Sequence, residues 1–389
     1  MAFKVFVSND VSEKGVALLR EHFDVDVMPN MPVPELCKII GEYDALVRRS
    51  QIQVTKELID AATNLKVIGR AGVGVDNIDI PAATARGIVV LNTPEGNTMA
   101  ATEHTVAMLM AMTRHIPQAH QSMQEGRWDR KSFDGIQVQN RTLGIIGVGR
   151  IGSRVAKRMQ GMEMTTIGYD PYITEERARQ VGVELVDLDT LLKRSDYITI
   201  HVPYNNNTKG TINADAISHM KGQVRIINLA RGGLVDDDDM IAALESGRVA
   251  RYVTDFPNHK IAMARNVIAL PHLGASTPES EENCAVMAAR QLQDYLVNGN
   301  IVNSVNMPNV EQEWSGICRL CLIHRNVPGM LTQIMTTLSD DGINVENMTN
   351  KSKKDFAYTM VDINSRINDE AAEDLRSIPG MIRVRILNH

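Results

Sequence analysis

We expect an α/β fold with parallel sheets and a smaller C-terminal module, and three features of the sequence predict it. Short apolar segments alternate with amphipathic segments from residue 3 to about 93. The alternation resumes at Thr142, where an apolar run leads into a glycine-rich turn and a helical segment. From about Ile317 the order becomes strand, helix, two strands, helix and strand. Parallel sheets need crossover helices, whereas the last order is typical of a ferredoxin-like module.

The first segment predicts a small α/β unit of its own. Its expected strands are Lys4–Ser8, Val25–Met28, Ala45–Arg48, Lys66–Arg70 and Ile88–Asn92. Helical spacing lies between them, for example in Glu13–Glu21 and Thr55–Ala62. One long helix, rich in Ala and Met, is then predicted from about Thr98 to Gln124. Its Met side chains favour core or interface packing over a cofactor role.

The second segment predicts a doubly wound parallel sheet, because helices alternate with its strands. The expected strands are Arg141–Ile146, Thr165–Asp170, Tyr197–Val202, Arg225–Leu229, Arg251–Thr254 and Asn266–Leu270. A helix from about Pro278 to Asn298 and a polar connector follow. The C-terminal module is expected to contain a strand from Ile317, a helix from Pro328 to Leu338, strands Ile343–Met348 and Phe356–Ile363, helix Asp369–Ser377 and strand Ile382–Leu387.

Composition excludes several classes of protein. With 389 residues, a net charge of −6 and a pI near 6.0, the chain offers no electrostatic case for nucleic acid or an anionic membrane. We expect no leader peptide and no membrane span, and four cysteines favour a reducing, cytoplasmic location. Cys318 and Cys321 lie three apart in a predicted strand, so they should face opposite sides. No metal site is predicted.

The glycine-rich turn is the most specific motif. Gly147, Gly149 and Gly152 follow a buried strand, with Arg150 and Ile151 between the last two. Glycine there makes a tight bend, lets the backbone approach phosphates and lets helix and strand pack closely. The next strand ends in Asp170, which is placed to hold the ribose hydroxyls and would repel a 2′-phosphate. The sequence therefore predicts NAD rather than NADP as the cofactor.

Two residues at the ends of later strands predict chemistry beside that cofactor. Arg231 directly follows a buried strand, where a guanidinium can bind a substrate carboxylate and polarise an adjacent carbonyl. A structural ion pair with Asp236–Asp239 is the alternative for Arg231. His272 also follows a strand, and imidazole, with an ordinary pKa of about 6.5, suits proton transfer near neutrality.

Four ordered motifs together resemble the D-3-phosphoglycerate dehydrogenase branch of the D-isomer-specific 2-hydroxyacid dehydrogenases. They are Gly69–Asp79, Gly147–Gly152, Asn228–Gly233 and Pro271–Thr277. The resemblance runs from about residue 3 to the C-terminus. It implies NAD-dependent oxidation of D-3-phosphoglycerate to 3-phosphohydroxypyruvate, the first step of serine synthesis.

The same resemblance implies a domain plan and a set of site residues. A flavodoxin-like substrate domain (1–95, completed by 281–305) would close on an inserted NAD domain (96–280), with a regulatory domain at 314–389. The residues implied to face substrate are Arg49, Ser50, Arg70, Gly74 and Asn97, with Lys131 as a further phosphate contact. Those implied to line the cofactor, besides the glycine turn and Asp170, are Val73, Val202, Leu229 and Asp255.

The chain departs from this family at one place. The family's catalytic histidine is normally oriented by a glutamate a few residues after the aspartate that Asp255 matches. Here the segment reads Phe256–Lys260 and contains no glutamate, so the position falls on His259 or Lys260. His272 would then lack the charge that stabilises its imidazolium. Three outcomes are open: Asp255 or another acid replaces the glutamate, His259 joins a relay, or turnover is impaired. We favour replacement by a nearby acid.

The C-terminal module resembles ACT domains, which bind amino acids between paired copies. The ligand-binding positions of serine-inhibited relatives match His324, Asn326 and Asn344, whose imidazole and amide groups suit an amino acid. The alternative is that the two asparagines only cap turns. The resemblance implies L-serine as an effector that restrains domain closure, and a homodimer or homotetramer.

Two other functions stay open at this stage. The substrate could be another D-2-hydroxy acid, such as glycerate or 2-hydroxyglutarate, with reduction of 2-oxoglutarate as the reverse reaction. The chain could also be an NAD-sensing binding protein, similar to the C-terminal-binding-protein corepressors, and the absent glutamate gives that reading some room. The ACT module and the extra arginines argue against another hydroxy acid. Arg231, His272 and the serine-type ACT turn weigh against the sensor, because a pure sensor needs neither catalytic residue.

Overall fold

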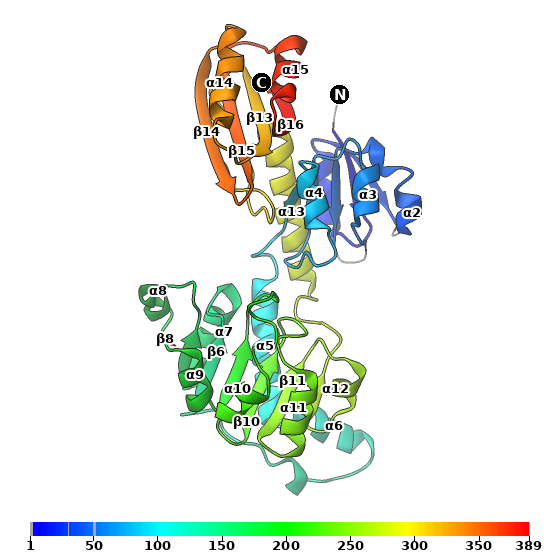
Figure 1. Cartoon of the computed structure of the whole chain (residues 1–389). Helices are drawn as coiled ribbons and strands as arrows, with labels where there is room; N and C mark the ends of the chain where they lie inside the picture. The colour runs from blue at the N-terminus through cyan, green and yellow to red at the C-terminus, as the bar shows by residue number, and fades with distance from the viewer. Residues whose placement is uncertain (1–2, 30, 50–51, 389) are drawn as a thin grey trace. The chain divides into compact units, whose positions relative to one another are not determined.

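The computed structural model describes residues 3–29, 31–49 and 52–388, which form two compact units (Figure 1). One unit contains the chain up to Asn97 together with the chain from Pro278 onward, and the other contains Thr98–Thr277. The finer division of the first unit into substrate and regulatory domains stays a prediction. Among the described residues, no helix is long and apolar enough to cross a bilayer.

The first unit contains a parallel sheet with the order β2-β1-β3-β4-β5. Its strands are β1 (Lys4–Ser8), β2 (Asp24–Met28), β3 (Ala45–Arg48), β4 (Val67–Arg70) and β5 (Val89–Leu91). Its helices are α1 (Glu13–Arg20), α2 (Val33–Leu36), α3 (Lys56–Ala61) and α4 (Ile80–Ala85), with a 3-10 turn at Ile40–Glu42. This order is the flavodoxin-like order, so the predicted class of the first sheet is confirmed.

Helix α13 (Pro278–Asn298) packs with α1 on one face of this sheet. Its buried side chains, among them Ala285, Leu292 and Tyr295, join the apolar residues of β1, β3 and β4 in one core. The inner strands β1, β3 and β4 are covered on both faces and are apolar except at their ends, whereas the edge strand β2 alternates with Asp24 and Asp26. The sequence pattern therefore predicted these strands well.

The second unit contains a seven-stranded parallel sheet with the order β12-β11-β10-β9-β6-β7-β8. Its strands are β6 (Thr142–Ile146), β7 (Thr165–Tyr169), β8 (Glu184–Leu185), β9 (Tyr197–Ile200), β10 (Val224–Asn228), β11 (Val249–Thr254) and β12 (Val267–Ala269). Its later helices are α7 (Arg150–Gln160), α8 (Glu175–Gln180), α9 (Leu188–Arg194), α10 (Ala214–His219), α11 (Asp237–Glu245) and α12 (His259–Met263). The doubly wound sheet is confirmed. The two-residue edge strand β8 has too short an apolar pattern to be predicted.

The single long helix predicted from Thr98 to Gln124 is wrong. The structure has two helices, α5 (Thr98–Thr113) and α6 (Ile116–Gln124), separated at His115. His115 adopts the left-handed conformation with φ 56°, and Pro117 lies in the first turn of α6. Proline is tolerated in a first turn but not within a helix, so the chain restarts the helix there. A short 3-10 turn, Lys131–Phe133, follows.

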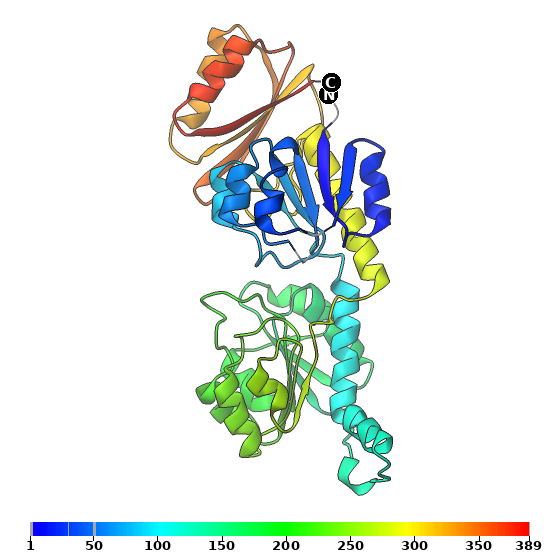
Figure 2. The same ribbon diagram turned by 90° about the vertical axis from the view of Figure 1, so that its right-hand side faces the viewer.

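The C-terminal sheet is antiparallel, with the order β14-β15-β13-β16 expected for a ferredoxin-like module. Its elements are β13 (Cys318–Arg325), α14 (Met330–Asp340), β14 (Val345–Lys353), β15 (Phe356–Ile363), α15 (Asp369–Ser377) and β16 (Met381–Asn388). Helices α14 and α15 cover one face (Figure 2). The other face packs on the core around α13.

Cys318 and Cys321 face opposite sides of the C-terminal sheet, as predicted. Cys318 belongs to the core under α14 and α15, and Cys321 to the core around α13. Both thiols are free and buried. Burial raises the pKa of each thiol, so neither has the thiolate character of a redox or metal site.

Candidate functional site

The glycine turn between β6 and α7 has the geometry that a bound pyrophosphate requires. Gly147 has φ 93°, and a Cβ there would lie 2.7 Å from the carbonyl oxygen of His201. A Cβ at Gly152 would collide with the carbonyl oxygen of Gly147. At Gly149 a Cβ would meet nothing within 4 Å, so the backbone there is open to an approaching group. Gly149 is also the N-cap of α7, and no side chain caps this helix start.

Asp170 lies directly after β7, as expected for an acid that binds ribose hydroxyls. One of its oxygens accepts a hydrogen bond from the backbone N–H of Val148 at 3.0 Å, and the other from that of Tyr172 at 2.9 Å. The carboxylate therefore also holds the glycine turn in place. Each oxygen keeps lone pairs for further donors.

The other residues expected at the cofactor follow neighbouring strands at the same edge of this sheet. Val202 comes after β9, Leu229 after β10 and Asp255 after β11. The β6–β9 neighbours lie where the strand order reverses, and open α/β sheets bind ligands at that point. His201, next to Val202, is held by Thr199 at 2.9 Å, and burial lowers the pKa of His201 to about 4. His201 is therefore neutral at physiological pH.

Arg231 and His272 contact the same aromatic ring. The imidazole of His272 packs against Phe256 with 4.3 Å between ring centroids and 44° between the ring planes, and the Arg231 guanidinium carbon lies 5.7 Å from the centroid of the Phe256 ring. Asn228 holds the Arg231 turn, because its amide donates to the Arg231 carbonyl at 2.9 Å. His272 has φ 52°, and its N–H donates to the Asp255 carbonyl at 3.1 Å. The structure thus brings the two predicted catalytic residues together around Phe256.

Asp255 lies beneath this group. The residue is buried, and within the described part of the chain neither carboxylate oxygen has a side-chain or backbone hydrogen-bond partner of good geometry. One oxygen lies 3.6 Å from the position a Cβ would take on Gly274. Burial raises the pKa of Asp255 to about 6, against weaker opposing effects of the Gly274 backbone and Arg231. Among the described residues, Asp255 is the buried acid nearest to His272 along the chain.

The residues at the expected glutamate position point elsewhere. Lys260 pairs with Asp238 at 2.9 Å, and the Asn258 amide donates to Asp237 at 2.6 Å while its oxygen caps α12. His259 begins α12 and is exposed. These contacts attach the segment to the start of α11.

The residues expected to bind substrate in the first unit lie at the carboxyl edge of its sheet. Arg70 ends β4, and its Nε donates to the Gly74 carbonyl at 3.0 Å and its Nη1 to that of Ala71 at 2.8 Å. Val73 and Gly74 belong to the same loop. Arg49 forms an ion pair of 2.8 Å with Glu281, in the first turn of α13. The buried amide oxygen of Asn97 has no hydrogen-bond partner among the described residues, and Ser50 lies outside those residues.

Lys131 belongs to the second unit. It is exposed in the 3-10 turn after α6. Its expected phosphate contact stays a prediction.

In the C-terminal sheet, one chain does not bring the three expected effector residues together. His324 is buried, with its Nδ1 bonded to the Arg325 carbonyl and its Nε2 to the Thr359 hydroxyl, both at 2.8 Å. Asn326 donates to the Lys354 carbonyl at 3.1 Å, at the hairpin end of β14 and β15. Asn344 precedes β14 at the opposite end. The strand between them separates the two asparagines by roughly 25 Å.

A cavity of about 610 Å³ opens at the Asn344 end of this sheet. It is lined by Trp314, Ser315, Gly316, Ile317, Glu346 and Asn364. The Asn344 amide donates to the Glu346 carboxylate at 3.2 Å, and the Asn364 N–H donates to the Asn344 carbonyl at 3.3 Å. Polar groups able to bind a small ligand therefore lie at this end.

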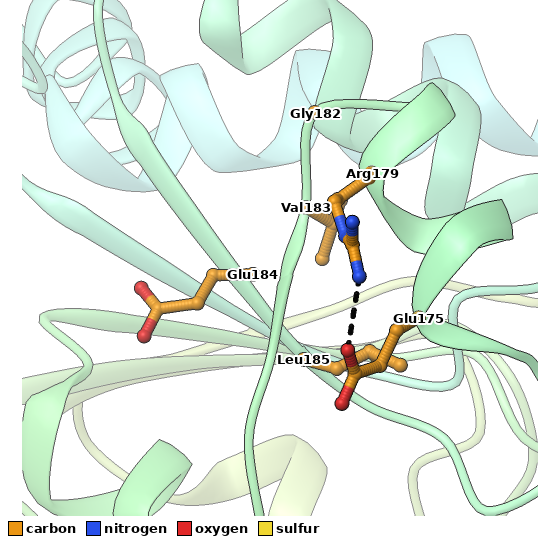
Figure 3. Close-up of a pocket in the computed structure, with 6 residues that line it drawn as sticks. All are labelled: Glu175, Arg179, Gly182, Val183, Glu184 and Leu185. Carbon is orange, nitrogen blue, oxygen red and sulfur yellow. Dashed lines mark hydrogen bonds and ion pairs between the residues drawn. The ribbon is translucent and has the colours of Figure 1, made fainter.

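The pocket drawn in Figure 3 is a different feature, at the sheet edge formed by α8 and β8. Its lining residues are Glu175, Arg179, Gly182, Val183, Glu184 and Leu185. Arg179 points toward Glu175, and the two side chains form an ion pair of 3.1 Å. None of the residues predicted to bind cofactor lines this pocket.

Sequence reasoning missed two residues that matter to these sites. Phe256 stood only in the segment that lacks a glutamate, and its contact with Arg231 and His272 needed the tertiary structure. Arg48 stands before the predicted Arg49, at the end of a strand that is otherwise apolar. A charge at that position of a buried strand is the signal that would have found it.

The doubly wound sheet and its glycine turn define a dinucleotide-binding protein. Comparison with known proteins identifies its family. Residues 106–274 match the D-isomer specific 2-hydroxyacid dehydrogenase, NAD binding domain. The chain belongs to the D-isomer specific 2-hydroxyacid dehydrogenase family, and the prediction of NAD as cofactor is confirmed.

Curated relatives and a solved structure agree with this family. The chain is 45% identical over 313 residues to D-3-phosphoglycerate dehydrogenase of Synechocystis sp., covering 79% of this chain and 56% of the relative. It is 40% identical over 348 residues to that of Methanocaldococcus jannaschii, covering 88% and 66%. D-lactate dehydrogenase from Aquifex aeolicus, complexed with NAD and lactic acid, matches with a TM-score of 0.67 and 26% identity, over 78% of this chain and 100% of that one. The chain thus spans about 56% to 66% of the length of these curated relatives.

Proposed function

We propose that this chain is an NAD-dependent dehydrogenase that oxidises D-3-phosphoglycerate to 3-phosphohydroxypyruvate. The observation that carries the proposal is the contact of Arg231 and His272 with one Phe256 ring, at the ligand-binding edge of the NAD-binding sheet. The names of the similar proteins support the choice of substrate. NAD, when bound, supplies the acceptor for the hydride that leaves C2.

The residues of this chain then have separate roles. Arg231 binds the substrate carboxylate with two N–H groups and polarises the carbonyl that forms at C2. His272 accepts the proton of the C2 hydroxyl through its imidazole, and Phe256 packs against that imidazole. Asp255 faces the same turn and takes the place of the absent glutamate as the nearby acid. The turn of Gly147, Gly149 and Gly152 holds the pyrophosphate.

The arginines of the first unit suit the phosphoryl end of this substrate. Arg70 already donates to backbone carbonyls of its own loop, which orients the guanidinium at the edge of the sheet. Arg49 is held by Glu281. A substrate with three negative charges needs cations besides Arg231, whereas lactate or glycerate does not.

The first experiment measures NADH formation at 340 nm with D-3-phosphoglycerate, D-glycerate and D-2-hydroxyglutarate. We expect the highest kcat/KM with D-3-phosphoglycerate. Replacing His272 by Gln should lower kcat by about 10²–10⁴-fold while NAD still binds, because general acid–base catalysis contributes that much. Preference for an unphosphorylated acid would refute D-3-phosphoglycerate as the substrate. NAD binding without turnover of any acid would favour an NAD sensor.

We further propose that L-serine binds the C-terminal sheet and slows turnover. The cavity beside Asn344 and the amides of Asn326 and Asn344 support it. Since the two asparagines lie at opposite ends of one sheet, a site that uses both is built from two copies of the chain. Asn344→Ala should abolish inhibition by millimolar serine, and unchanged inhibition would refute this site.

A further inference from the structure

Arg48 and Arg70 are direct neighbours in the first sheet. Arg48 is the last residue of β3 and Arg70 the last residue of β4, and the two are paired in the parallel register. Paired residues of adjacent parallel strands project to the same face, so the two side chains leave the carboxyl edge together. Like charges at such positions repel each other. This edge is also where open parallel sheets bind ligands.

The guanidinium of Arg48 is buried and only partly satisfied. Arg48 has no exposed surface. Its Nη1 donates to the Asn77 side-chain oxygen at 2.7 Å, while Nε and Nη2 have no hydrogen-bond partner among the residues that the structure describes. Asp10 attracts Arg48 through space, but the Asp10 carboxylate accepts a hydrogen bond from Ser8. Buried guanidinium groups are normally paired, so this one keeps a largely uncompensated positive charge next to Arg70.

The surroundings of Arg48 confirm that its charge is disfavoured in the chain alone. Burial lowers the pKa of Arg48 to about 10, and repulsion from Arg70 adds to that effect. Removing such a group should stabilise the ligand-free chain, because an unpaired buried charge costs desolvation energy. If Arg48 only stabilised the fold, its removal would instead destabilise the ligand-free chain.

Arg48 and Arg70 hold one loop from two sides. Arg70 donates to the carbonyls of Ala71 and Gly74, and Arg48 donates to Asn77 at the other end of the loop. The Ala71 N–H in turn donates to the Arg48 carbonyl at 2.8 Å. The conformation of this loop therefore depends on the positions of both guanidinium groups.

We propose that Arg48 is a positioning residue for the phosphoryl group of the substrate, acting behind Arg70 and through the loop of residues 71–77. Two adjacent guanidinium groups favour a dianion over a singly charged or neutral group. The identity of the substrate in this inference rests on the proposed function. The two charged residues, Arg48 and Arg70, both belong to the first unit.

The test compares Arg48→Met, Arg48→Lys and Arg86→Met with the unaltered chain. Arg86 follows α4 at the opposite edge of the sheet, so Arg86→Met removes the same charge away from the loop. Binding of inorganic phosphate is measured by calorimetry in the presence of saturating NAD, so that the glycine turn is occupied. Melting temperatures are measured without ligands.

For Arg48→Met we expect a phosphate Kd at least about 10-fold higher and a melting temperature unchanged or higher. Arg48→Lys should restore part of the affinity, and Arg86→Met should bind as the unaltered chain does. In turnover, Arg48→Met should raise the KM for D-3-phosphoglycerate and leave that for D-glycerate unchanged. A lower melting temperature with unchanged phosphate affinity, or no phosphate binding by the unaltered chain, overturns the proposal.

The two proposals fail in different ways. If the chain oxidises D-3-phosphoglycerate and Arg48→Met keeps the same KM, the role of Arg48 is wrong and the function stands. If no hydroxy acid is oxidised but phosphate binding still depends on Arg48, the function is wrong and the anion site stands.

Discussion

At the scale of single residues, Asp255 shows how the fold changes the chemistry of a side chain. Its pKa in the folded chain, about 6, exceeds the ordinary value of 3.8 because the carboxyl is buried. Between about pH 4 and pH 6 the folded chain therefore binds more protons than the unfolded chain. Stability is highest at the acid end of that window and is lost as the pH rises through 6.

Replacing Asp255 by Asn should therefore stabilise the chain at neutral pH, because the amide has the same shape and no charge to bury. We expect a gain of about 2–3 kcal/mol at pH 7.5 that shrinks toward zero near pH 4. Urea unfolding of the variant and of the unaltered chain at several pH values measures the difference. An equal gain at all pH values would show that the pKa of Asp255 is not raised.

A second residue-scale prediction concerns the glycine turn. Gly152→Ala should lower stability by about 1–3 kcal/mol and NAD affinity at least about 10-fold, because the new methyl group collides with the Gly147 carbonyl. Gly222→Ala is the matched control, since a Cβ there would meet nothing within 4 Å. NAD titration and melting temperatures check both variants. Equal behaviour of the two would refute the close packing of α7 on β6.

At the scale of elements, the end of α13 is joined to the C-terminal sheet by buried charges. Arg319 and Asp362 are fully buried and form an ion pair of 2.6 Å. Arg319 also donates to the Asn298 carbonyl, and Arg385 donates to those of Tyr295 and Leu296. Cations that bind the last carbonyls of a helix also interact favourably with its dipole. Burial alone would raise the pKa of Asp362, but hydrogen bonds led by that of Arg319 hold the pKa below its ordinary value.

Breaking this pair should be costly. Asp362→Asn leaves Arg319 without its counter-charge, and we expect a loss of about 3–5 kcal/mol, measured by urea unfolding. Glu373→Gln removes an exposed partner of Arg376 in the same domain and should change stability by less than about 0.5 kcal/mol. A similar small loss for both variants would mean that the buried pair does not anchor the sheet.

At the scale of the whole molecule, the positions of Asn326 and Asn344 make the proposed effector site a property of two chains. An equal mixture of Asn326→Ala and Asn344→Ala chains that exchange subunits should regain about one quarter of the serine sites. About half of the pairs then contain both variants, and one of the two sites in each such pair has both amides. Calorimetry of the mixture and of each variant alone tests this. No binding by the mixture, with binding by the unaltered chain, would refute the shared site.

The sequence predicted those parts of the fold in which the spacing of apolar residues follows directly from the secondary structure. The first sheet, the doubly wound sheet and the C-terminal sheet are all confirmed, because buried strands and crossover helices leave regular apolar patterns. Prediction failed at His115, where Pro117 restarts a helix that composition alone made continuous. For the sites, the positions of the glycine turn, Asp170, Arg231 and His272 after their strands could be read from spacing. The contact of Arg231 and His272 with Phe256 could not, because it joins loops after three different strands.

The sequence by itself determined the class of fold, the cofactor and the family, since these depend on local spacing of glycine, acid and apolar residues. Only the tertiary structure decided which charges are buried and what faces them. Arg48 lies beside Arg70 because two strands far apart in sequence pair in register. Asp255 is protonated more readily than an ordinary acid because the His272 turn folds over it. Burial and cross-strand pairing are set by contacts between distant segments, and no local pattern records them.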